Sequence, residues 1–398
     1  MIARVVVLRY DDVVLLKDTE KCDLQILKGI SYEWHSTLNN LIPSHSIIIF
    51  VILLAISELI RRFYTGMPKF STLSGSIVMA IGIFSLDTLQ QLPFVNPFIS
   101  QLISVELFVI WLYLVQFYIN SYLSGSFNTY IKSLSNQFGI GTWVAGCSVL
   151  GILLITEMPS WYIIIWTVAL LAFVIWLFYL KIILVNLMRI VKKQKQIHTG
   201  IILLSTVSTQ SIVLLFDALS ILRIPVLINQ TLIICGYLFY IIGMLIIARH
   251  YLSIKLKRVI LSWSSSNSII HGALSITGLA STLTRVMSEH IIVYTWLLAT
   301  CFFILVETIS LIKLSYRIKL TGWKQGVFIY DLSQWSRIFT YGMYYAFTLS
   351  IVNHHLFDHF VAGMIAQYGQ YVVFLLLLFE VILFLYTRMI RYRIADKK

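Results

Sequence analysis

Ten long apolar segments follow one another along this chain, and they restrict its fold more than any other feature. A helix needs about 20 mostly apolar residues to cross the hydrocarbon core of a bilayer. Only 12% of the residues are charged, against about 25% in a typical soluble domain. We therefore expect an all-α integral membrane protein with ten transmembrane helices. The predicted spans are residues 74–92, 98–121, 139–156, 161–181, 199–219, 229–249, 269–287, 291–312, 338–356 and 360–386.

Basic residues alternate between the two sides of these predicted spans. They gather before helix one, after every even-numbered helix and at the C-terminus, with Lys132, Arg189 and Arg258 as examples. The loops on the opposite side hold only Arg223 and Arg285. Because cytoplasmic loops carry the excess of Lys and Arg, both termini are predicted to lie in the cytoplasm, with the helices in the cell membrane. The net charge of +13 then reflects membrane topology and does not indicate nucleic-acid binding.

The chain divides into four predicted parts. Residues 1–45 are more polar and are expected to form an N-terminal cytoplasmic segment with some strand character. Residues 46–70 contain a short apolar run at 47–60, which fits an interfacial helix or an additional short membrane helix. The ten-helix transport domain would cover residues 71–390, and residues 391–398 would form a cytoplasmic tail.

Odd-numbered and even-numbered helices differ in composition. The odd ones are richer in Gly, Ala, Ser and Thr, whereas the even ones are rich in aromatic and large aliphatic residues, as at 161–180. Small residues allow close helix contact or face a cavity, and large apolar side chains suit lipid. The alternation predicts five quasi-repeated helical hairpins, with the odd helices as an inner ring around a central pore.

The fifth predicted helix is the most polar, and its hydroxyls and amide could replace part of an ion's hydration shell. The candidate pore-lining residues are Ser205, Thr206, Ser208, Thr209 and Gln210. Ser and Thr also bond back to their own helix, and Gln210 fits a helix–helix contact equally well. Both interpretations of these residues remain open.

Acidic residues within the apolar segments are functional hypotheses by default. Glu106, Glu307 and Glu380 lie inside predicted spans, and Asp87 and Asp217 lie near span ends. Most of them fall on even-numbered helices or near interfaces, which favours structural roles. A proton-coupling role for Glu307 remains open.

The sequence offers one candidate for a different class of function. His354, His355 and His359 lie within residues 353–359, and His355 and His359 could share one helical face. Interfacial histidines are the favoured interpretation, so no metal and no cofactor are predicted, and we do not expect an enzyme. The alternatives are an integral-membrane enzyme with its site in this segment, or a non-conducting membrane scaffold.

Several stretches resemble the tellurite-resistance/C4-dicarboxylate transporter family, which includes the slow anion channels of plant guard cells. They are SIVMAIGIFS at 76–85, FGIGTWVAGCSVLG at 138–151, GIILLSTVSTQS at 200–211, HGALSITGLA at 271–280 and IFTYGMY at 338–344. The most specific match is 200–211, which resembles a WLLAVVATQS-type segment. The resemblance runs from about residue 73 to the end of helix ten.

This resemblance implies a channel or transporter that moves small anions, such as a dicarboxylate, tellurite or sulfite, through a central pore, commonly in a homotrimer. It also implies a phenylalanine on helix nine that closes the pore, for which Phe339 and Tyr341 are the candidates. Family members often use proline to kink the inner helices, and such prolines are missing in this chain. We expect glycines to serve instead, namely Gly82, Gly146, Gly278 and Gly342.

Overall fold

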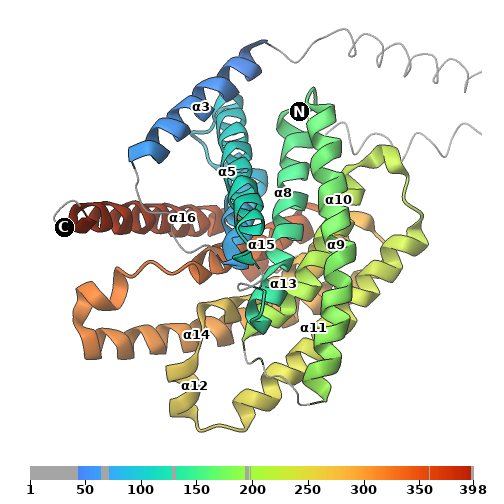
Figure 1. Ribbon diagram of the computed structural model, residues 1–398. Coiled ribbons are helices and arrows are strands. Elements are labelled where there is room, and N and C mark those ends of the chain that lie inside the picture. Colours follow the sequence, from blue (N-terminus) through green and yellow to red (C-terminus); the bar gives the residue numbers. More distant parts are fainter. Residues whose placement is uncertain are drawn as a thin grey trace, which may run out of the picture. The chain divides into compact units, whose positions relative to one another are not determined.

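The computed structural model describes residues 44–63, 71–127, 131–192, 197, 199–357 and 359–395. Within these ranges every regular element is a helix (Figure 1). The predicted segment 1–45, including its expected strand character, lies outside the described residues except for its last two positions, and so does the end of the predicted tail. The contacts among the helices lie within the unit Ile49–Lys398.

In chain order, the helices are α3 (Ser44–Phe63), η1 (Thr72–Ser74), α4 (Gly75–Ile83), η2 (Phe84–Thr88), η3 (Leu89–Gln91), α5 (Pro97–Leu123), α7 (Leu134–Gly139), α8 (Gly141–Glu157), α9 (Tyr162–Val191), η4 (Gly200–Leu203), α10 (Leu204–Ala218), η5 (Ser220–Leu222), α11 (Val226–Leu252), α12 (Leu256–Ser262), η6 (Ser265–Ser268), α13 (Ile269–Thr284), α14 (Glu289–Val327), α15 (Ser333–Asn353) and α16 (Phe360–Ala395).

Eight helical stretches of the described chain are long and apolar enough to cross a membrane, which is compatible with a multi-pass membrane protein. They correspond to eight of the ten predicted spans. The other two predicted spans, 269–287 and 338–356, are the helices α13 and α15, and neither is among the eight. Helix α13 has only 16 residues, and α15 carries Arg337 together with several hydroxyl-bearing residues. Helices that other helices cover need less apolar surface than helices that face lipid.

The ends of several helices differ from the prediction. Helix α5 begins as expected, because Pro97 occupies its first turn and the Asn96 side chain accepts a hydrogen bond from the Ile99 amide. Helix α14 is predicted to end at residue 312 but continues to Val327, with a break at Gly322, where φ is +79°. Apolar length limits only the part of a helix within lipid, so a basic continuation can remain helical beyond it.

Burial separates the helices into two groups. In the stretches 72–91, 134–157 and 200–218, between 72% and 83% of the residues in the most apolar window are buried. In the stretches containing α5, α9, α11, α14 and α16 the corresponding share is between 17% and 44%. Helices α13 and α15 are also mostly buried. The five odd-numbered predicted helices are therefore the covered ones, and the five even-numbered ones present apolar surface.

The buried helices contact one another in chain order. Helix α4 packs on α8, α8 on α10, α10 on α13, α13 on α15, and α15 packs back on α4. Each outer helix contacts the buried helix before it and the one after it, as α9 does with α8 and α10. The last outer helix, α16, contacts α15 and the η2 segment that continues α4.

The apolar run predicted at 47–60 lies in helix α3. Its apolar part, Ser46–Leu59, is shorter than the eight long stretches. The ring of Phe50 packs against Phe108 of α5 at 5.8 Å and against Trp161 at 6.0 Å between centroids. These contacts attach α3 to the helical unit through aromatic packing, and both the interfacial and the spanning interpretation remain predictions.

Candidate functional site

The polar side chains of α10 make contacts with the outer helix α11. Thr206 Oγ1 donates a hydrogen bond to the carbonyl oxygen of Gly236 at 3.1 Å. Gln210 Nε2 donates to the carbonyl oxygen of Ile233 at 3.3 Å. The absence of a side chain at Gly236 makes room for Gln210, because a Cβ on residue 236 would overlap the side-chain amide of Gln210. These two residues of the predicted pore lining thus point towards α11.

The remaining three predicted lining residues bond to η4, within α10 or towards α9. Ser205 Oγ donates to the carbonyl of Ile202 at 2.8 Å, and Ser208 Oγ donates to that of Ser205 at 3.1 Å. Thr209 Oγ1 donates to the Ser205 carbonyl at 2.9 Å and lies 3.4 Å from the indole Nε1 of Trp176 on α9. The hydroxyls of all three are satisfied by helices, and their role in lining a pore stays a prediction.

Helix α15 carries both candidate gate residues, and two of its faces meet buried helices. The side chain of Thr340 rests against Gly272 of α13, where a Cβ would overlap it. Gly342 faces Ile83 of α4 in the same close manner.

Two other faces of α15 meet outer helices. The indole Nε1 of Trp296 on α14 donates to Thr348 Oγ1 at 2.9 Å. The hydroxyl of Tyr345 donates to Gln370 Oε1 on α16 at 3.3 Å. The contacts on α15 therefore mark the directions of four neighbouring helices.

The two gate candidates have different surroundings. Phe339 is 1% exposed. The ring of Tyr341 packs on Phe303 of α14 at a centroid distance of 5.0 Å and on His271 of α13 at 6.1 Å. The guanidinium carbon of Arg337 lies 5.8 Å from the centroid of the Tyr341 ring. Tyr341 therefore belongs to a cluster between α13, α14 and α15.

A charged pair lies at the centre of that cluster. Arg337 donates to both carboxylate oxygens of Glu307, through Nη2 to Oε2 and through Nε to Oε1 at 3.4 Å. His271 Nε2 lies 4.0 Å from Glu307 Oε1. Neither ring nitrogen of His271 has a hydrogen-bond partner among the described residues, and the residue is fully buried. Charged groups in a low-dielectric interior are costly and are usually paired, as Glu307 and Arg337 are.

The sequence alone indicates only one member of this charged pair. Glu307 stands out as an acidic residue in an apolar segment, whereas Arg337 falls among the basic residues of a predicted loop. Helix α15 begins at Ser333, ahead of the predicted span. Arg337 therefore lies within the first two turns of α15, where its side chain faces α14. A basic residue a few positions before a span, together with a carboxylate inside the preceding span, is the signal that could have found the pair.

Two further intramembrane carboxylates have limited contacts. Glu106 on α5 accepts a hydrogen bond from Ser57 Oγ of α3 at 3.3 Å. Glu380 on α16 is 3% exposed, and its Oε1 atom has no hydrogen-bond partner in the described part of the chain. The Glu106 contact joins two helices, and the structural roles expected for most of the acidic residues stay a prediction.

The glycines predicted to kink the inner helices lie where helices approach each other closely. Gly82 of α4 meets the side chain of Val149 on α8, and Gly278 of α13 meets the ring of Phe347 on α15. A Cβ on Gly146 would lie 3.1 Å from a backbone oxygen of α4. Helices α8, α13 and α15 continue without interruption through their glycines. The structure thus gives these glycines a packing role, and their role in kinking remains a prediction.

The histidine segment lies between α15 and α16. His359 Nδ1 accepts a hydrogen bond from the Val361 amide at 3.3 Å, and its ring stacks on Phe357 at 5.3 Å. His355 has a φ of +53°, and Asp358 lies outside the described residues. Within the described ranges, no three His, Cys, Asp or Glu residues are grouped to hold a metal ion. The enzyme alternative therefore gains no support from this segment.

No protein-family model matches the sequence, and no curated protein is found to be similar to it. The resemblance to the tellurite-resistance/C4-dicarboxylate transporter family therefore rests on the five sequence segments alone.

Proposed function

We propose that this chain moves small anions across the cell membrane along an axis enclosed by α4, α8, α10, α13 and α15. The order of contacts among these helices carries the proposal, because each packs on the next and α15 packs on α4. Five helices in contact in this cyclic order would surround a common axis. The outer helices would shield that axis from lipid, and α13 and α15 would bring the number of spans to ten.

The contacts of α15 support Phe339 as the residue that closes this axis. Successive residues of a helix are rotated by about 100°, so the four neighbours of α15 define four directions around it. Thr340 marks the direction of α13, and Gly342 marks that of α4. Phe339 and Met343 fall in the sector between these two directions. This sector is on the side of α15 that points away from α14 and α16. Both are 1% exposed, so in this conformation the path would be closed.

The contacts of α10 define directions around that helix in the same way, and they suggest a revised lining. Thr206 marks the direction of α11 and Thr209 that of α9, whereas Leu215 meets α8 at Gly151. The remaining sector, shared by α13 and the axis, holds Val207 and Ser211. We propose Ser211 as the hydroxyl-bearing lining residue on α10.

Phe339→Ala tests the gate in proteoliposomes that contain the purified full-length protein. Uptake of labelled sulfite, nitrate, malate and tellurite would be measured separately, which also identifies the transported anion. Lowering the barrier by about 1.4 kcal/mol would raise the rate about tenfold, and we expect at least this increase. Tyr341→Ala is the matched control, because its ring lies against α14.

Three outcomes would refute parts of this proposal. Equal flux in Phe339→Ala and the unmodified protein would remove Phe339 as the gate. A larger increase in Tyr341→Ala than in Phe339→Ala would reverse the assignment of the two residues. If no anion is transported by any of the variants, the non-conducting scaffold becomes the better interpretation.

The orientation and assembly belong to the same proposal. The basic residues after the even-numbered predicted helices support cytoplasmic N- and C-termini. The resemblance to the tellurite-resistance/C4-dicarboxylate transporter family suggests a homotrimer in which each chain contains its own path. Glu307 lies on α14, on the side of α15 that points away from the proposed axis. Proton uptake by this carboxylate could accompany anion movement.

A further inference from the structure

A polar cavity of about 300 Å³ lies between the η6 segment, the middle of α14 and the beginning of α15. The wall from the η6 side contains Ser264 and Ser265, and the wall from α14 contains Lys313 and Arg317. The third wall includes Arg337. Because Arg337 projects from α15 towards α14, the cavity lies away from the sector that contains Phe339.

Cations outnumber anions in the lining of this cavity. Lys313 and Arg317 contribute two positive charges, the charge of Arg337 is offset by its ion pair with Glu307, and Asp331 is the one carboxylate among the lining residues. Asp331 Oδ1 accepts a hydrogen bond from the Ser333 amide at 3.0 Å, at the beginning of α15. The helix N-terminus therefore already compensates part of the single negative charge. The lining as a whole is positive.

The three cations differ in how far they are already engaged. Lys313 Nζ donates to the carbonyl oxygen of Trp263, which still leaves two of its three donors. Arg337 is bonded to Glu307. Arg317 is different, because its Nε atom is buried and has no acceptor among the described residues. An unsatisfied buried guanidinium donor requires an acceptor other than the described residues, such as water or an anion.

The donors around the cavity suit an oxyanion. A guanidinium presents its donors as a planar fork that matches phosphate, sulfate and carboxylate groups. Lys313 adds a compact point charge, and the hydroxyls of Ser264 and Ser265 are further donors at the edge. A volume of about 300 Å³ accommodates one such group together with water.

We propose that this cavity binds an oxyanion group through Arg317 and Lys313, next to the Arg337–Glu307 ion pair. The ligand is either a free ion of the phosphate or sulfate type or the phosphate of an anionic phospholipid headgroup. This site goes beyond the proposed transport function and does not depend on it, because it lies on the α14 side of α15.

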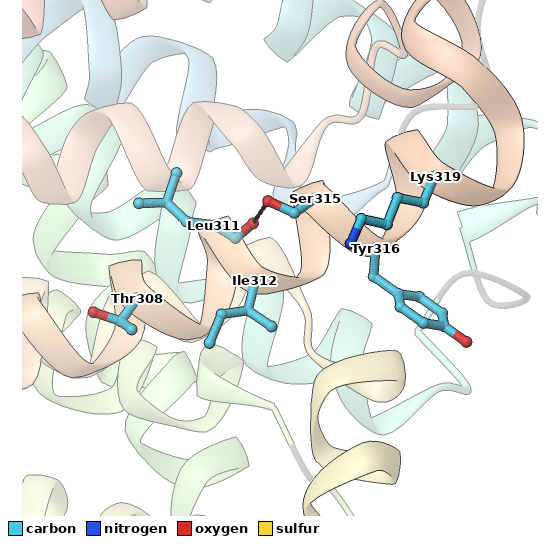
Figure 2. Close-up of a pocket in the computed structure, with 6 residues that line it drawn as sticks. All are labelled: Thr308, Leu311, Ile312, Ser315, Tyr316 and Lys319. Carbon is cyan, nitrogen blue, oxygen red and sulfur yellow. Dashed lines mark hydrogen bonds between the residues drawn. The ribbon is translucent and has the colours of Figure 1, made fainter.

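The opposite face of α14 provides a matched control. Figure 2 shows a groove on that face with Lys319 at one end, lined by Thr308, Leu311, Ile312, Ser315, Tyr316 and Lys319. Lys319 is two residues from Arg317, so the two side chains point to opposite sides of the helix. Lys319→Gln thus removes the same charge from the same helix without changing the lining of the polar cavity.

Binding would be measured on the full-length protein in lipid nanodiscs. One arm uses phosphatidylcholine nanodiscs with labelled inorganic phosphate or sulfate at constant ionic strength. The other arm replaces part of the phosphatidylcholine with phosphatidylglycerol, and native mass spectrometry detects the lipid that stays bound. Binding in the first arm identifies a free ion as the ligand, and retention only in the second arm identifies a headgroup.

The variants decide whether the cavity is the site. Arg317→Gln should weaken binding about tenfold, because a hydrogen bond to a charged group is lost, and Lys319→Gln should bind like the unmodified protein. Arg317→Lys keeps the charge and should fall between them, which provides a result even if Arg317→Gln does not fold. The proposal fails if the unmodified protein binds neither probe. It also fails if both Arg317 variants bind normally, or if Lys319→Gln loses as much affinity as they do.

Discussion

Removal of the Arg337 guanidinium should destabilise the protein through the carboxylate that remains behind. Arg337 bonds both oxygens of Glu307, and His271 lies 4.0 Å from the same carboxylate. In Arg337→Gln, Glu307 would remain buried beside an imidazole with no cation bonded to it. Glu307→Gln leaves the opposite defect, a guanidinium without its anion.

The structure sets the size of this effect. Breaking a buried ion pair by removing one partner typically costs about 3–5 kcal/mol, whereas replacing both partners is often nearly neutral. The side chain of Glu307 is 10% exposed and that of Arg337 is 26% exposed, so water reaches the cation in part. We therefore expect the lower end of the range for each single variant, about 3 kcal/mol. The double variant Glu307→Gln/Arg337→Gln should lose much less than the sum of the two.

The free energy of unfolding would be measured by reversible titration of the purified protein with sodium dodecyl sulfate in mixed micelles, followed by circular dichroism. Arg189→Gln is the control, since Arg189 is an exposed residue near the end of α9. A coupling energy of about 2 kcal/mol or more is expected from the double-mutant cycle. Additive single effects, or single variants as stable as the control, would show that the pair is not a buried, mutually dependent unit.

Two further predictions concern packing and pH. Gly278→Ala should cost about 1–3 kcal/mol of unfolding free energy in the same titration, because its Cβ would overlap the ring of Phe347. Gly363→Ala, with nothing within 4 Å of its Cβ, should be close to neutral, and equal losses in the two variants would contradict the packing role. His354 follows the last residue of α15, and its pKa is lowered by desolvation and by the charges of Arg285 and a neighbouring histidine. Arg285→Asn, which tolerates the positive φ at this position, should raise that pKa towards 6.5 in an NMR titration. Because the folded pKa lies below the unfolded one, His354 reduces stability as the pH falls below 6.5, and the variant should show less of this loss. An unchanged pKa would show that Arg285 does not act on His354.

Apolar length and composition predicted the helical framework of the described chain. The apolar run at 98–121 located α5, and the small residues of 139–156 correctly marked that segment as buried. Helix α14 shows where this reasoning ends. Hydropathy predicted its end near residue 312, but the helix continues to a break at Gly322 and resumes up to Val327, because basic residues such as Lys313 and Arg317 are good helix formers outside lipid.

The candidate sites were less accessible to sequence reasoning. Residues 205–211 of α10 are polar on nearly every side, so no single face stands out as the one that lines a pore. Only the positions of Trp176 and Gly236 on the neighbouring helices show which direction each hydroxyl takes. Likewise, Phe339 and Tyr341 are two residues apart and equally plausible in the sequence, yet they point to different neighbours.

The approximate positions of the apolar helices and their relative burial follow from the order of the residues, because both depend on local composition and on the length needed to cross lipid. The pairing of Glu307 with Arg337, the surroundings of Tyr341 and the positive cavity at Arg317 emerge only when the helices pack. Each of these depends on the rotation of one helix against another. Neighbouring positions on a helix point about 100° apart, so a rotation of the helix by that angle brings a side chain to a different neighbour. Composition does not determine how each helix is rotated about its own axis.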